Sequence, residues 1–384
     1  MTLRLRLLAL VALVCIAAPS PQAQKDQKAP APPKKNPLLK LVEPWPDAEA
    51  MKARRADAEA RALFQSQDPL EFTLTAPFSI INKDHNPEST KRYPGVLMVN
   101  GADGAPRNIA VQLSARGHFR RMARNCSWVP LRVEFPKEGK EGLAGTPFDG
   151  QTTLKLGTGC EDSKEFEQIT LREYLGYPLY NMVTPLSFRA RLGRGTYVEE
   201  KSQKKLTTRT ALFIENDSDV AKRNEGRIVE LKRVEFKDLA PVTLTRAMLY
   251  EYAIGNTDVS IWALHNVKLV QTPTRTLFLV PYDFDLGGLV HAPYAIPDQH
   301  LGLRSVVDRL YRGPCRTVDE FEVVAAGFRA KRADMFALVD SMKAFDGSTR
   351  SEVKDYLESF FRTIDKPDSI KKTFVNGCKP KPYM

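Results

Sequence analysis

One stretch of the chain, residues 251–291, constrains the fold more than any other. It reads as the end of a helix stopped by Gly255, followed by a polar turn and two short strands, 265–271 and 275–280. An acidic bend, residues 283–285, comes directly after the second strand and is followed by two glycines. This order predicts a β-hairpin with polar side chains at its ends.

Four side chains that carry oxygen atoms bracket the hairpin and can meet at its ends: Asp258, Asn266, Asp283 and Asp285. Carboxylate and amide oxygens in this mixture suit a hard cation such as Mg²⁺, and a phosphate group can share the ion. The sequence therefore predicts a metal and phosphate site at this hairpin.

The first 23 residues are typical of a secretory signal peptide. A basic start is followed by an apolar run, Leu7–Ala18, and then by small residues, with cleavage fitting after Ala18 or Ala23. The apolar run is too short to span a bilayer. We therefore expect an exported protein, periplasmic or extracellular, without a transmembrane anchor.

The remaining chain divides by composition. Residues 24–46 are rich in Pro and Lys and predict an extended tether, and residues 47–66 predict a lead-in helix. Residues 67–384 are expected to form one domain, with an N-terminal lobe at 67–216 and a C-terminal lobe at 217–384.

Short apolar segments separated by turn residues make the N-terminal lobe β-rich. The predicted strands are 70–76, 94–100, 109–115, 131–135, 152–156, 187–199 and 208–215, with one helix at 164–182. Pro178 should bend or end that helix. A further helix is expected at 243–254, with Thr243 as a candidate N-cap, and apolar stripes predict helices within 318–342 and 353–364. The fold class is therefore α+β, with a mainly helical C-terminal lobe.

Export leaves four cysteines in the mature chain: Cys126, Cys160, Cys315 and Cys378. An even number of cysteines in an oxidising compartment predicts two disulfides, although four cysteines allow three connectivities. Pairing neighbours in sequence gives 126 with 160 and 315 with 378.

The chain is basic, with a formal net charge of +11. The charge is concentrated locally in Arg116–Arg124 and Lys201–Lys205, but neither cluster forms a basic stripe with interleaved aromatics. We therefore expect no nucleic-acid partner. A basic surface is either simply solvated or suited to anionic substrates and cell-envelope polymers.

Two charged residues of the N-terminal lobe fall among apolar neighbours. Lys155 alternates with leucines on a predicted strand, and Glu173 lies within the apolar stripe of the helix at 164–182. An unpaired buried carboxylate is costly, so a pair between these two residues would satisfy both and would position nucleotide phosphates. The alternatives are an outward-facing lysine, or a structural pair of Glu173 with Arg172 or Arg189.

Several short motifs follow one another in an order that resembles the spore-coat-protein-H (CotH) kinase family, an atypical group related to secreted protein kinases. They are Arg116-Gly117, Leu154-Lys155-Leu156, Arg172-Glu173-Tyr174-Leu175, Phe213-Ile214-Glu215, Gly255-Asn256-Thr257-Asp258, His265-Asn266 and Pro281-Tyr282-Asp283-Phe284-Asp285. The resemblance covers roughly residues 113–288. It implies an atypical protein-kinase-like fold of two lobes.

The resemblance also implies a role for each matching residue. Asp258 would be the catalytic carboxylate for an attacking hydroxyl. Metal ligation would fall to Asp283 and Asn266, with Asp285 as a further ligand. The residues implied to contact ATP are Lys155, Glu173, Glu215 and Arg116, with Arg120 and Arg121 near the phosphates. The implied activity is transfer of the γ-phosphate of ATP, with Mg²⁺ or Mn²⁺, to a hydroxyl of a protein or envelope polymer.

Three features differ from the kinase pattern. The acidic bend ends in Asp285-Leu286-Gly287-Gly288 rather than in a simple Asp-Phe-Gly. A single Gly117 in an arginine-rich turn stands where kinases have a glycine-rich loop, and an apolar segment, Val259–Leu264, separates Asp258 from Asn266. The alternative function is therefore a catalytically inactive CotH-like protein that binds or assembles envelope components. A metal-dependent hydrolase fits less well, because a structural role is expected for His265, the one histidine close to the acidic residues.

Overall fold

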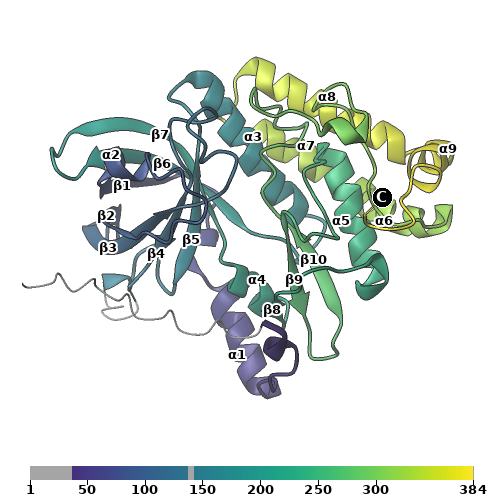
Figure 1. Ribbon diagram of the computed structural model, residues 1–384, viewed down its shortest axis with the longest axis horizontal. Coiled ribbons are helices and arrows are strands. Elements are labelled where there is room, and N and C mark those ends of the chain that lie inside the picture. The colour runs from purple at the N-terminus through teal and green to yellow at the C-terminus, as the bar shows by residue number, and fades with distance from the viewer. Residues whose placement is uncertain (1–36, 137–141, 384) are drawn as a thin grey trace, which may run out of the picture. The chain divides into compact units, whose positions relative to one another are not determined.

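The computed structural model describes residues 37–136 and 142–383 (Figure 1). The expected signal peptide and tether residues 24–36 lie outside these residues. The end of the expected tether is structured: Pro37–Leu41 is a short 3-10 helix, and Arg227 donates hydrogen bonds to the carbonyls of Leu41 and Glu43 and stacks on Trp45. The lead-in helix is α1, Ala48–Glu59.

Seven strands of the N-terminal half close into a barrel in the order β1-β2-β3-β4-β5-β7-β6. Their bounds are β1 Leu70–Ala76, β2 Tyr93–Asn100, β3 Pro106–Ala115, β4 Leu131–Glu134, β5 Thr153–Thr158, β6 Ala190–Glu199 and β7 Lys205–Ile214. All pairings are antiparallel except β1 with β6, which is parallel and closes the barrel. The predicted strands are confirmed, and the sheet that they form is closed.

Glycines explain how the barrel closes at the β1–β6 seam. Phe72 of β1 is buried, and its ring lies against Gly193 and Gly195 of β6. A Cβ atom at Gly193 would come within 2.8 Å of this ring, and one at Gly195 within 2.4 Å. Because both positions lack a side chain, the Phe72 ring fills the barrel interior against the backbone of β6.

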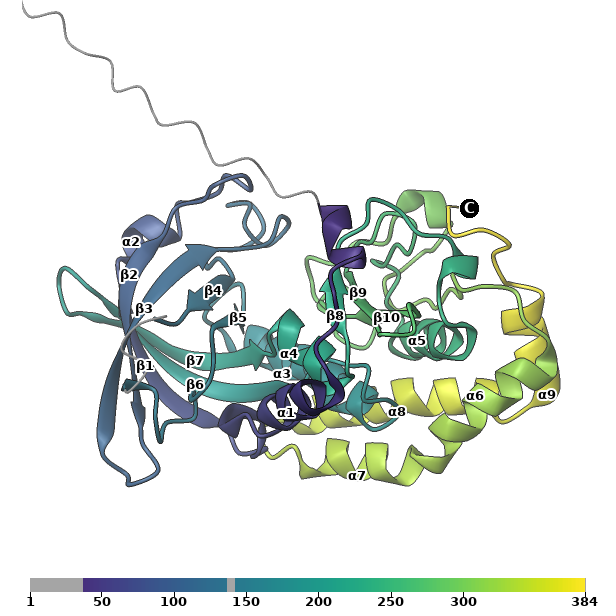
Figure 2. The same ribbon diagram turned by 90° about the horizontal axis from the view of Figure 1, so that it is seen from below.

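The C-terminal half is mainly helical and contains a small antiparallel sheet of order β10-β9-β8. Its elements are α4 Asp217–Arg223, β8 Arg227–Val229, α5 Pro241–Ile254, β9 Val267–Gln271, β10 Leu277–Pro281, α6 Val318–Ala330, α7 Arg332–Ser341, α8 Gly347–Ile364 and α9 Pro367–Ile370. Helix α3, Lys164–Asn181, comes from the N-terminal half but packs its buried face into the core of this half (Figures 1 and 2). The hairpin predicted within residues 251–291 is β9–β10.

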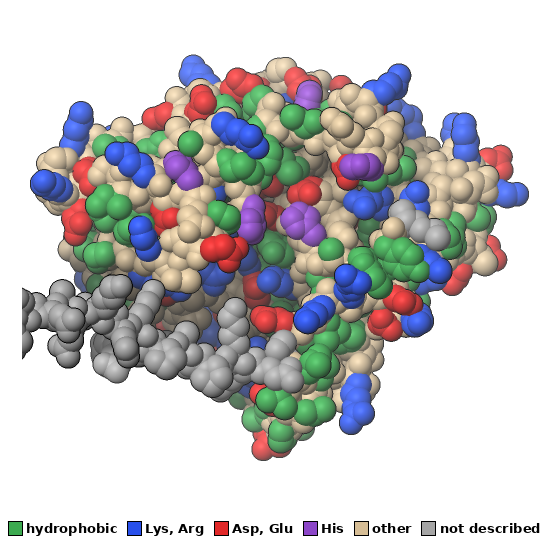
Figure 3. Space-filling model, viewed as in Figure 1, with side chains coloured by type: hydrophobic (Ala, Val, Ile, Leu, Met, Phe, Trp, Pro, Cys, Tyr) green, Lys and Arg blue, Asp and Glu red, His purple; other side chains and the backbone are tan. Residues whose placement is uncertain are grey.

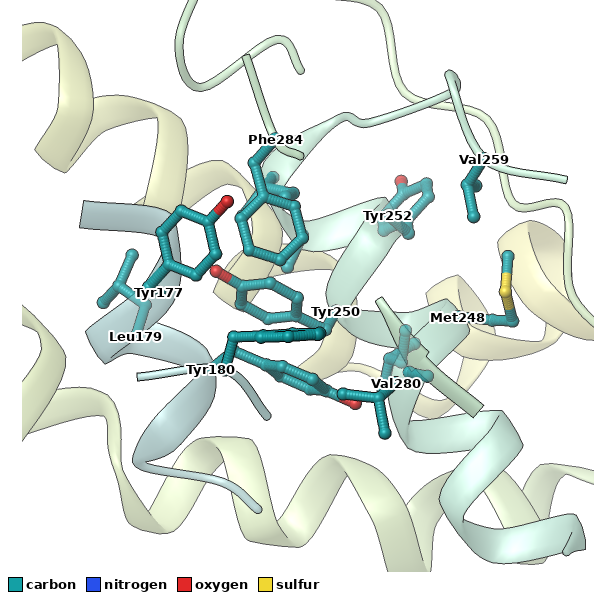
Figure 4. Packing of buried hydrophobic residues seen from close by; sticks show 14 of the residues in the cluster. Tyr177, Leu179, Tyr180, Met248, Tyr250, Tyr252, Val259, Val280 and Phe284 are labelled. Carbon is teal, nitrogen blue, oxygen red and sulfur yellow. The ribbon is translucent and has the colours of Figure 1, made fainter. Parts of the chain in front are cut away.

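A group of aromatic side chains joins α3 to α5 and to the acidic bend after β10 (Figure 4). The Tyr250 ring stacks on Tyr180 with 4.4 Å between centroids, and its hydroxyl donates to the Gly176 carbonyl. Phe284 packs edge-on against Tyr250 at 5.7 Å and against Tyr177 at 4.9 Å. These contacts fix the position of the bend at residues 283–285 relative to α3.

The helix bounds agree with expectation in part. Helix α3 confirms the helix expected at 164–182, and Pro178 lies inside it and does not end it. Helix α5 begins at Pro241, not at Thr243, since proline fits the first helical position, where its missing N–H group costs nothing. The apolar stripe at 318–342 forms two helices, α6 and α7, separated at Lys331.

Both disulfide pairings expected from sequence order are present. Cys126 pairs with Cys160, and Cys315 pairs with Cys378. Two disulfides are consistent with an exported protein. In the part of the chain that the structure describes, no helix combines the length and the apolar character needed to cross a membrane.

We expect Gly176→Ala to destabilise the protein. A Cβ atom at this position of α3 would lie 2.9 Å from the buried Phe284 ring, so either the ring or the helix must move. Overpacking of this kind costs about 1–3 kcal/mol in the free energy of unfolding, measured by urea denaturation. The matched control is Gly327→Ala in α6, where nothing lies within 4 Å and a gain of about 0.5–1 kcal/mol is expected from helix propensity. Equal effects of the two substitutions would contradict this account of the packing.

Candidate functional site

The two ends of the hairpin lie close together in the structure, as the sequence predicts. The N–H of Tyr282, after β10, donates to the carbonyl of Asn266, before β9, at 3.0 Å. The charges of Asp283 and Asp258 both act on Asp285, and together with burial they raise its pKa above the ordinary value. Figure 3 shows acidic, basic and histidine side chains gathered near the middle of the face drawn there.

The turn that carries Asp258 is built at the end of α5. Gly255 ends the helix in the left-handed conformation, with a φ of 64°. The Asn256 side chain then accepts a hydrogen bond from the N–H of Asp258 at 3.1 Å. Arg312 donates to the carbonyls on both sides of Asp258, those of Thr257 at 2.6 Å and Val259 at 2.8 Å. The backbone at Asp258 is therefore held from two directions.

The Asp258 carboxylate has two side-chain partners. Asn266 Nδ2 donates to Asp258 Oδ2 at 2.9 Å and to its backbone carbonyl at 2.8 Å, and His265 Nε2 lies 3.2 Å from Oδ1. The hydrogen bond to Asp258 raises the pKa of His265. His265 therefore contacts the candidate catalytic carboxylate directly, which the sequence did not indicate.

The apolar segment between Asp258 and Asn266 does not cover the carboxylate. Val259 and Ile261 are buried in the core, and Ser260 and His265 pair across the base of the loop. The Asp258 side chain remains 36% exposed. The segment thus turns inward and leaves the carboxylate open to a ligand.

Arg120 is the central cation of the site. Its guanidinium binds Glu173 of α3 with two hydrogen bonds, of 3.1 and 3.3 Å, and its Nε lies 3.2 Å from Asp285 Oδ2. All three side chains are buried. Burial alone would lower the pKa of Arg120, but the charges of Glu173 and Asp285 raise it well above the ordinary value. One arginine therefore connects the loop after β3, helix α3 and the acidic bend.

The loop that carries Arg120 is fixed at several points. Gly117 turns the chain with a φ of 82°. Arg121 is buried and contacts the carbonyl and the carboxylate of Asp84 at 2.6 and 2.8 Å. The disulfide of Cys126 closes the far end of the loop. The guanidinium of Arg116, at the start of the loop, is near the acidic bend, with 3.8 Å between Nη2 and Asp283 Oδ1.

The partners of Lys155 and Glu173 differ from those expected. Glu173 pairs with Arg120, so the pair with Lys155 and the alternative pairs with Arg172 and Arg189 were all wrong. Lys155 is buried and forms an ion pair with Asp217, which Lys268 also contacts at 3.3 Å. The reason is that Asp217 follows β7, the neighbour of β5 in the barrel.

Burial also changes the acidity of Lys155. Desolvation lowers its pKa to about 8, against the opposing effect of Asp217. Its ammonium lies 4.8 Å from the centre of the Phe188 ring and 5.0 Å from that of Tyr282. A pocket of about 230 Å³ opens beside it, lined by Lys155, Asn216, Asp217, Ser218 and Ile228 among others.

Glu215 does not present its carboxylate to a ligand. The side chain is fully buried, and both oxygens accept hydrogen bonds from Arg189 and Arg223 at 2.8–3.0 Å. A further bond comes from the backbone N–H of Arg189 at 2.9 Å. Glu215 lines the pocket beside Lys155, but both oxygens of its carboxylate are bound by arginines. The expected contact of this carboxylate with ATP is therefore corrected.

The residues expected to hold a metal fit an ion in part. Among residues 37–136 and 142–383, no group of three or more His, Cys, Asp or Glu side chains is arranged to ligate one ion. Asp285 is committed to Arg120. Asn266, however, uses its nitrogen to bind Asp258, so its amide oxygen faces no hydrogen-bond donor in the described chain. Asp283, which is 26% exposed, and the Asn266 oxygen are the available ligands.

Some of these contacts left little trace in the sequence. Asp217 reads as a helix residue after a strand, and nothing local indicates that it binds Lys155 and Lys268. Arg120 lies in a loop without periodicity, so its buried position was not apparent. Nothing in the sequence indicated that Asp84 is the ion-pair partner of Arg121. The run of acidic residues after β7 was the one available signal for Asp217.

No known family model matches this chain, and no curated protein matches it in sequence.

We expect Arg120→Ala to lower the free energy of unfolding by about 3–5 kcal/mol, because it leaves two buried carboxylates without their partner. The loss should be smaller at pH 5 than at pH 8. Burial already raises the pKa values of Glu173 and Asp285, and without the arginine both groups can be protonated at the lower pH. Urea denaturation at the two pH values measures both effects.

The control for this substitution is Arg107→Ala, which removes an exposed ion pair with Asp103. Its effect on the free energy of unfolding should be small, because solvent screens the pair, and should not depend on pH in this range. If Arg120→Ala behaved like this control, Arg120 would not be the residue that joins the three segments.

Proposed function

We propose that this protein is an exported, kinase-like phosphotransferase that moves the γ-phosphate of ATP to a hydroxyl group. The observation that carries the proposal is the state of Arg116. Its side chain is 13% exposed, and in the described chain its guanidinium makes no hydrogen bond; its one ionic neighbour is Asp283 at 3.8 Å. A guanidinium held without hydrogen bonds in a cluster of charges is suited to receive phosphate oxygens.

Other cations support a phosphate beside Arg116. The charge of Arg116 lowers the pKa of Lys155, after the larger effects of burial and Asp217, so the two cations are near one another. Lys268 is the third cation of this group, because it contacts the same carboxylate, that of Asp217, as Lys155 does. Without a ligand these cations repel one another. A bound polyphosphate would offset this repulsion and accept charge-assisted hydrogen bonds from them. The pocket next to Lys155 supplies space for the rest of a nucleotide.

The proposed base is Asp258. Asn266 and His265 hold its two oxygens, and its side chain is partly exposed. In the proposed reaction the acceptor hydroxyl oxygen attacks the γ-phosphorus and its proton passes to the Asp258 carboxylate. The bond between the γ-phosphorus and its bridging oxygen breaks, and ADP leaves with that electron pair. Positioning and charge stabilisation account for most of the catalysis in this class.

A divalent cation completes the proposal. Asp283 and the Asn266 amide oxygen would hold Mg²⁺ or Mn²⁺, which neutralises charge on the phosphates. Asp283 has a φ of 66°, and its N–H donates to the Tyr177 hydroxyl at 3.2 Å. The backbone is thus held in an unusual conformation that directs this carboxylate.

Two features of the structure support the proposed kinase-like fold and the proposed location outside the cytoplasm. A β-rich half and a helical half, joined through α3, are the arrangement that the resemblance to CotH kinases implies. The two disulfides support action in the periplasm or outside the cell. The acceptor is then a hydroxyl of an exported protein or an envelope polymer.

One observation favours the alternative of an inactive CotH-like protein that binds or assembles envelope components. Several charged groups of the site already have ionic partners: Glu173 and Asp285 through Arg120, and Lys155 through Asp217. These ion pairs stabilise the fold, and a protein without catalytic activity requires only that of its charged residues. The two functions differ in whether Asp258 and Arg116 contribute to phosphate transfer.

We expect Mg-ATP to stabilise the protein by about 2.7 kcal/mol at 100-fold saturation, measured as a rise in melting temperature. Asp283→Ala should abolish this shift, and Arg116→Ala should weaken nucleotide binding about tenfold or more, because it removes charged hydrogen bonds to phosphate. Asp258→Asn should retain the shift but lower phosphate transfer about 100-fold or more.

The control substitution is Asp340→Ala on α7, which removes an exposed carboxylate paired with Lys354. It should change neither nucleotide binding nor transfer. A shift with no phosphate transfer by the unaltered protein would favour the inactive binding protein. If Mg-ATP causes no shift, ATP is neither a substrate nor a bound ligand of this protein.

A further inference from the structure

A buried carboxyl group lies directly behind the turn that presents Asp258. Glu251, in the last turns of α5, is 1% exposed. Neither of its side-chain oxygens has a hydrogen-bond partner among the described residues. A charged carboxylate in this position would lack both solvent and a compensating cation.

The neighbouring donor is the side-chain amide of Asn256. Asn256 is 2% exposed, and its Nδ2 likewise has no partner in the described chain. Its backbone N–H donates to the Glu251 carbonyl at 2.8 Å, which places the two residues side by side. The oxygen of the same amide accepts the N–H of Asp258. Asn256 therefore stands between Glu251 and the turn that carries Asp258.

Asp258, in the turn that follows, is the charged group that opposes the ionisation of Glu251. The hydroxyls of Tyr180 on α3 and Tyr250 on α5 are also near it, and a charge on Glu251 raises the pKa of both. Burial raises the pKa of Glu251 to about 8, the amide of Asn256 acts in the opposite direction, and the charge of Asp258 raises it further. Glu251 is thus neutral in the folded protein at neutral pH.

We propose that Glu251 is a positioning residue, whose uncharged carboxyl group packs beside the Asn256 amide and so keeps the turn that presents Asp258 in place. The inference rests on the proposed role of Asp258 as the base. When Glu251 ionises, an unpaired charge appears beside that turn, and the Asn256 side chain must shift or water must enter. Alkaline pH therefore loosens the turn through Glu251. This effect is separate from the loss of the Lys155 proton in the nucleotide pocket, which also occurs near pH 8.

The free energy of unfolding should also depend on whether Glu251 is ionised. In the unfolded chain Glu251 ionises near pH 4.5, whereas in the folded chain it retains its proton to about pH 8. The folded state thus binds the additional proton between these values, and stability falls as pH rises through this interval. Glu251→Gln, which resembles the neutral acid, lacks this fall.

The first experiment measures hydrogen exchange by mass spectrometry in a peptide that spans residues 251–266, at pH 6.5 and pH 9. At pH 6.5, Glu251→Gln should match the unaltered protein, and Glu251→Ala should exchange faster. At pH 9, the unaltered protein should exchange faster than Glu251→Gln. Comparison at the same pH cancels the intrinsic effect of pH on exchange.

The second experiment follows phosphate transfer and Mg-ATP binding from pH 6 to pH 9.5. The transfer rate of the unaltered protein should fall above about pH 8, and Glu251→Gln should make this fall smaller. The affinity for Mg-ATP should be the same in the two proteins at each pH, because loss of the Lys155 proton affects both alike. A purely structural role would alter the melting temperature but not the pH profile of transfer. The control is Glu200→Gln at an exposed hairpin position, which should change neither profile.

The outcomes separate this inference from the proposed function. If the protein transfers no phosphate, the exchange experiment and the melting temperature of Glu251→Gln against pH still decide the role of Glu251. The proposal is overturned if Glu251→Gln and the unaltered protein show the same ratio of exchange rates at both pH values. It is equally overturned if Glu251→Gln opens the turn at pH 6.5 as Glu251→Ala does.

Discussion

The contact on which the rest of this structure depends is that of Arg120 with two buried carboxylates. Glu173 comes from the helix that links the halves of the domain, and Asp285 comes from the bend after the last strand. A buried ion pair is stable when all its members are present and becomes costly when one is missing. The three segments are therefore interdependent, and the loop after β3 is as much a part of the site as the acidic hairpin.

The aromatic group beneath the bend complements this contact. Phe284 packs where Gly176 leaves room, and Asp283 and Asn266 both adopt positive φ angles next to it. Non-glycine residues persist in such conformations when surrounding contacts determine them. The packing of Phe284 thus sets the direction in which Asp283 extends, the hydrogen bonds to Asp258 hold Asn266, and Arg120 joins the bend to α3.

The sequence predicted most of the elements and the approach of the hairpin ends, because both follow from local patterns. Period-two and helical spacings mark β1 and α8, and the hairpin brings Asn266 beside Tyr282 without any long-range information. The partners of isolated charges could not be predicted this way. Lys155 binds Asp217 because barrel closure places β5 beside β7, and a pairing across strands distant in sequence has no local signature. The contacts of Glu215 with Arg189 and Arg223 also lacked a local signature, because they form only when separate segments of the fold come together.

The closed barrel restricts how the N-terminal half can recognise a partner. An open sheet has a free edge, whose unpaired N–H and C=O groups can capture an extended chain as an additional strand. Here the parallel pairing of β1 with β6 uses that edge internally. Any polymer or polypeptide that approaches the barrel must therefore be recognised by side chains and loops rather than by backbone pairing. The exposed β6–β7 hairpin, with Lys201, Lys204 and Lys205, offers such a surface to anionic chains.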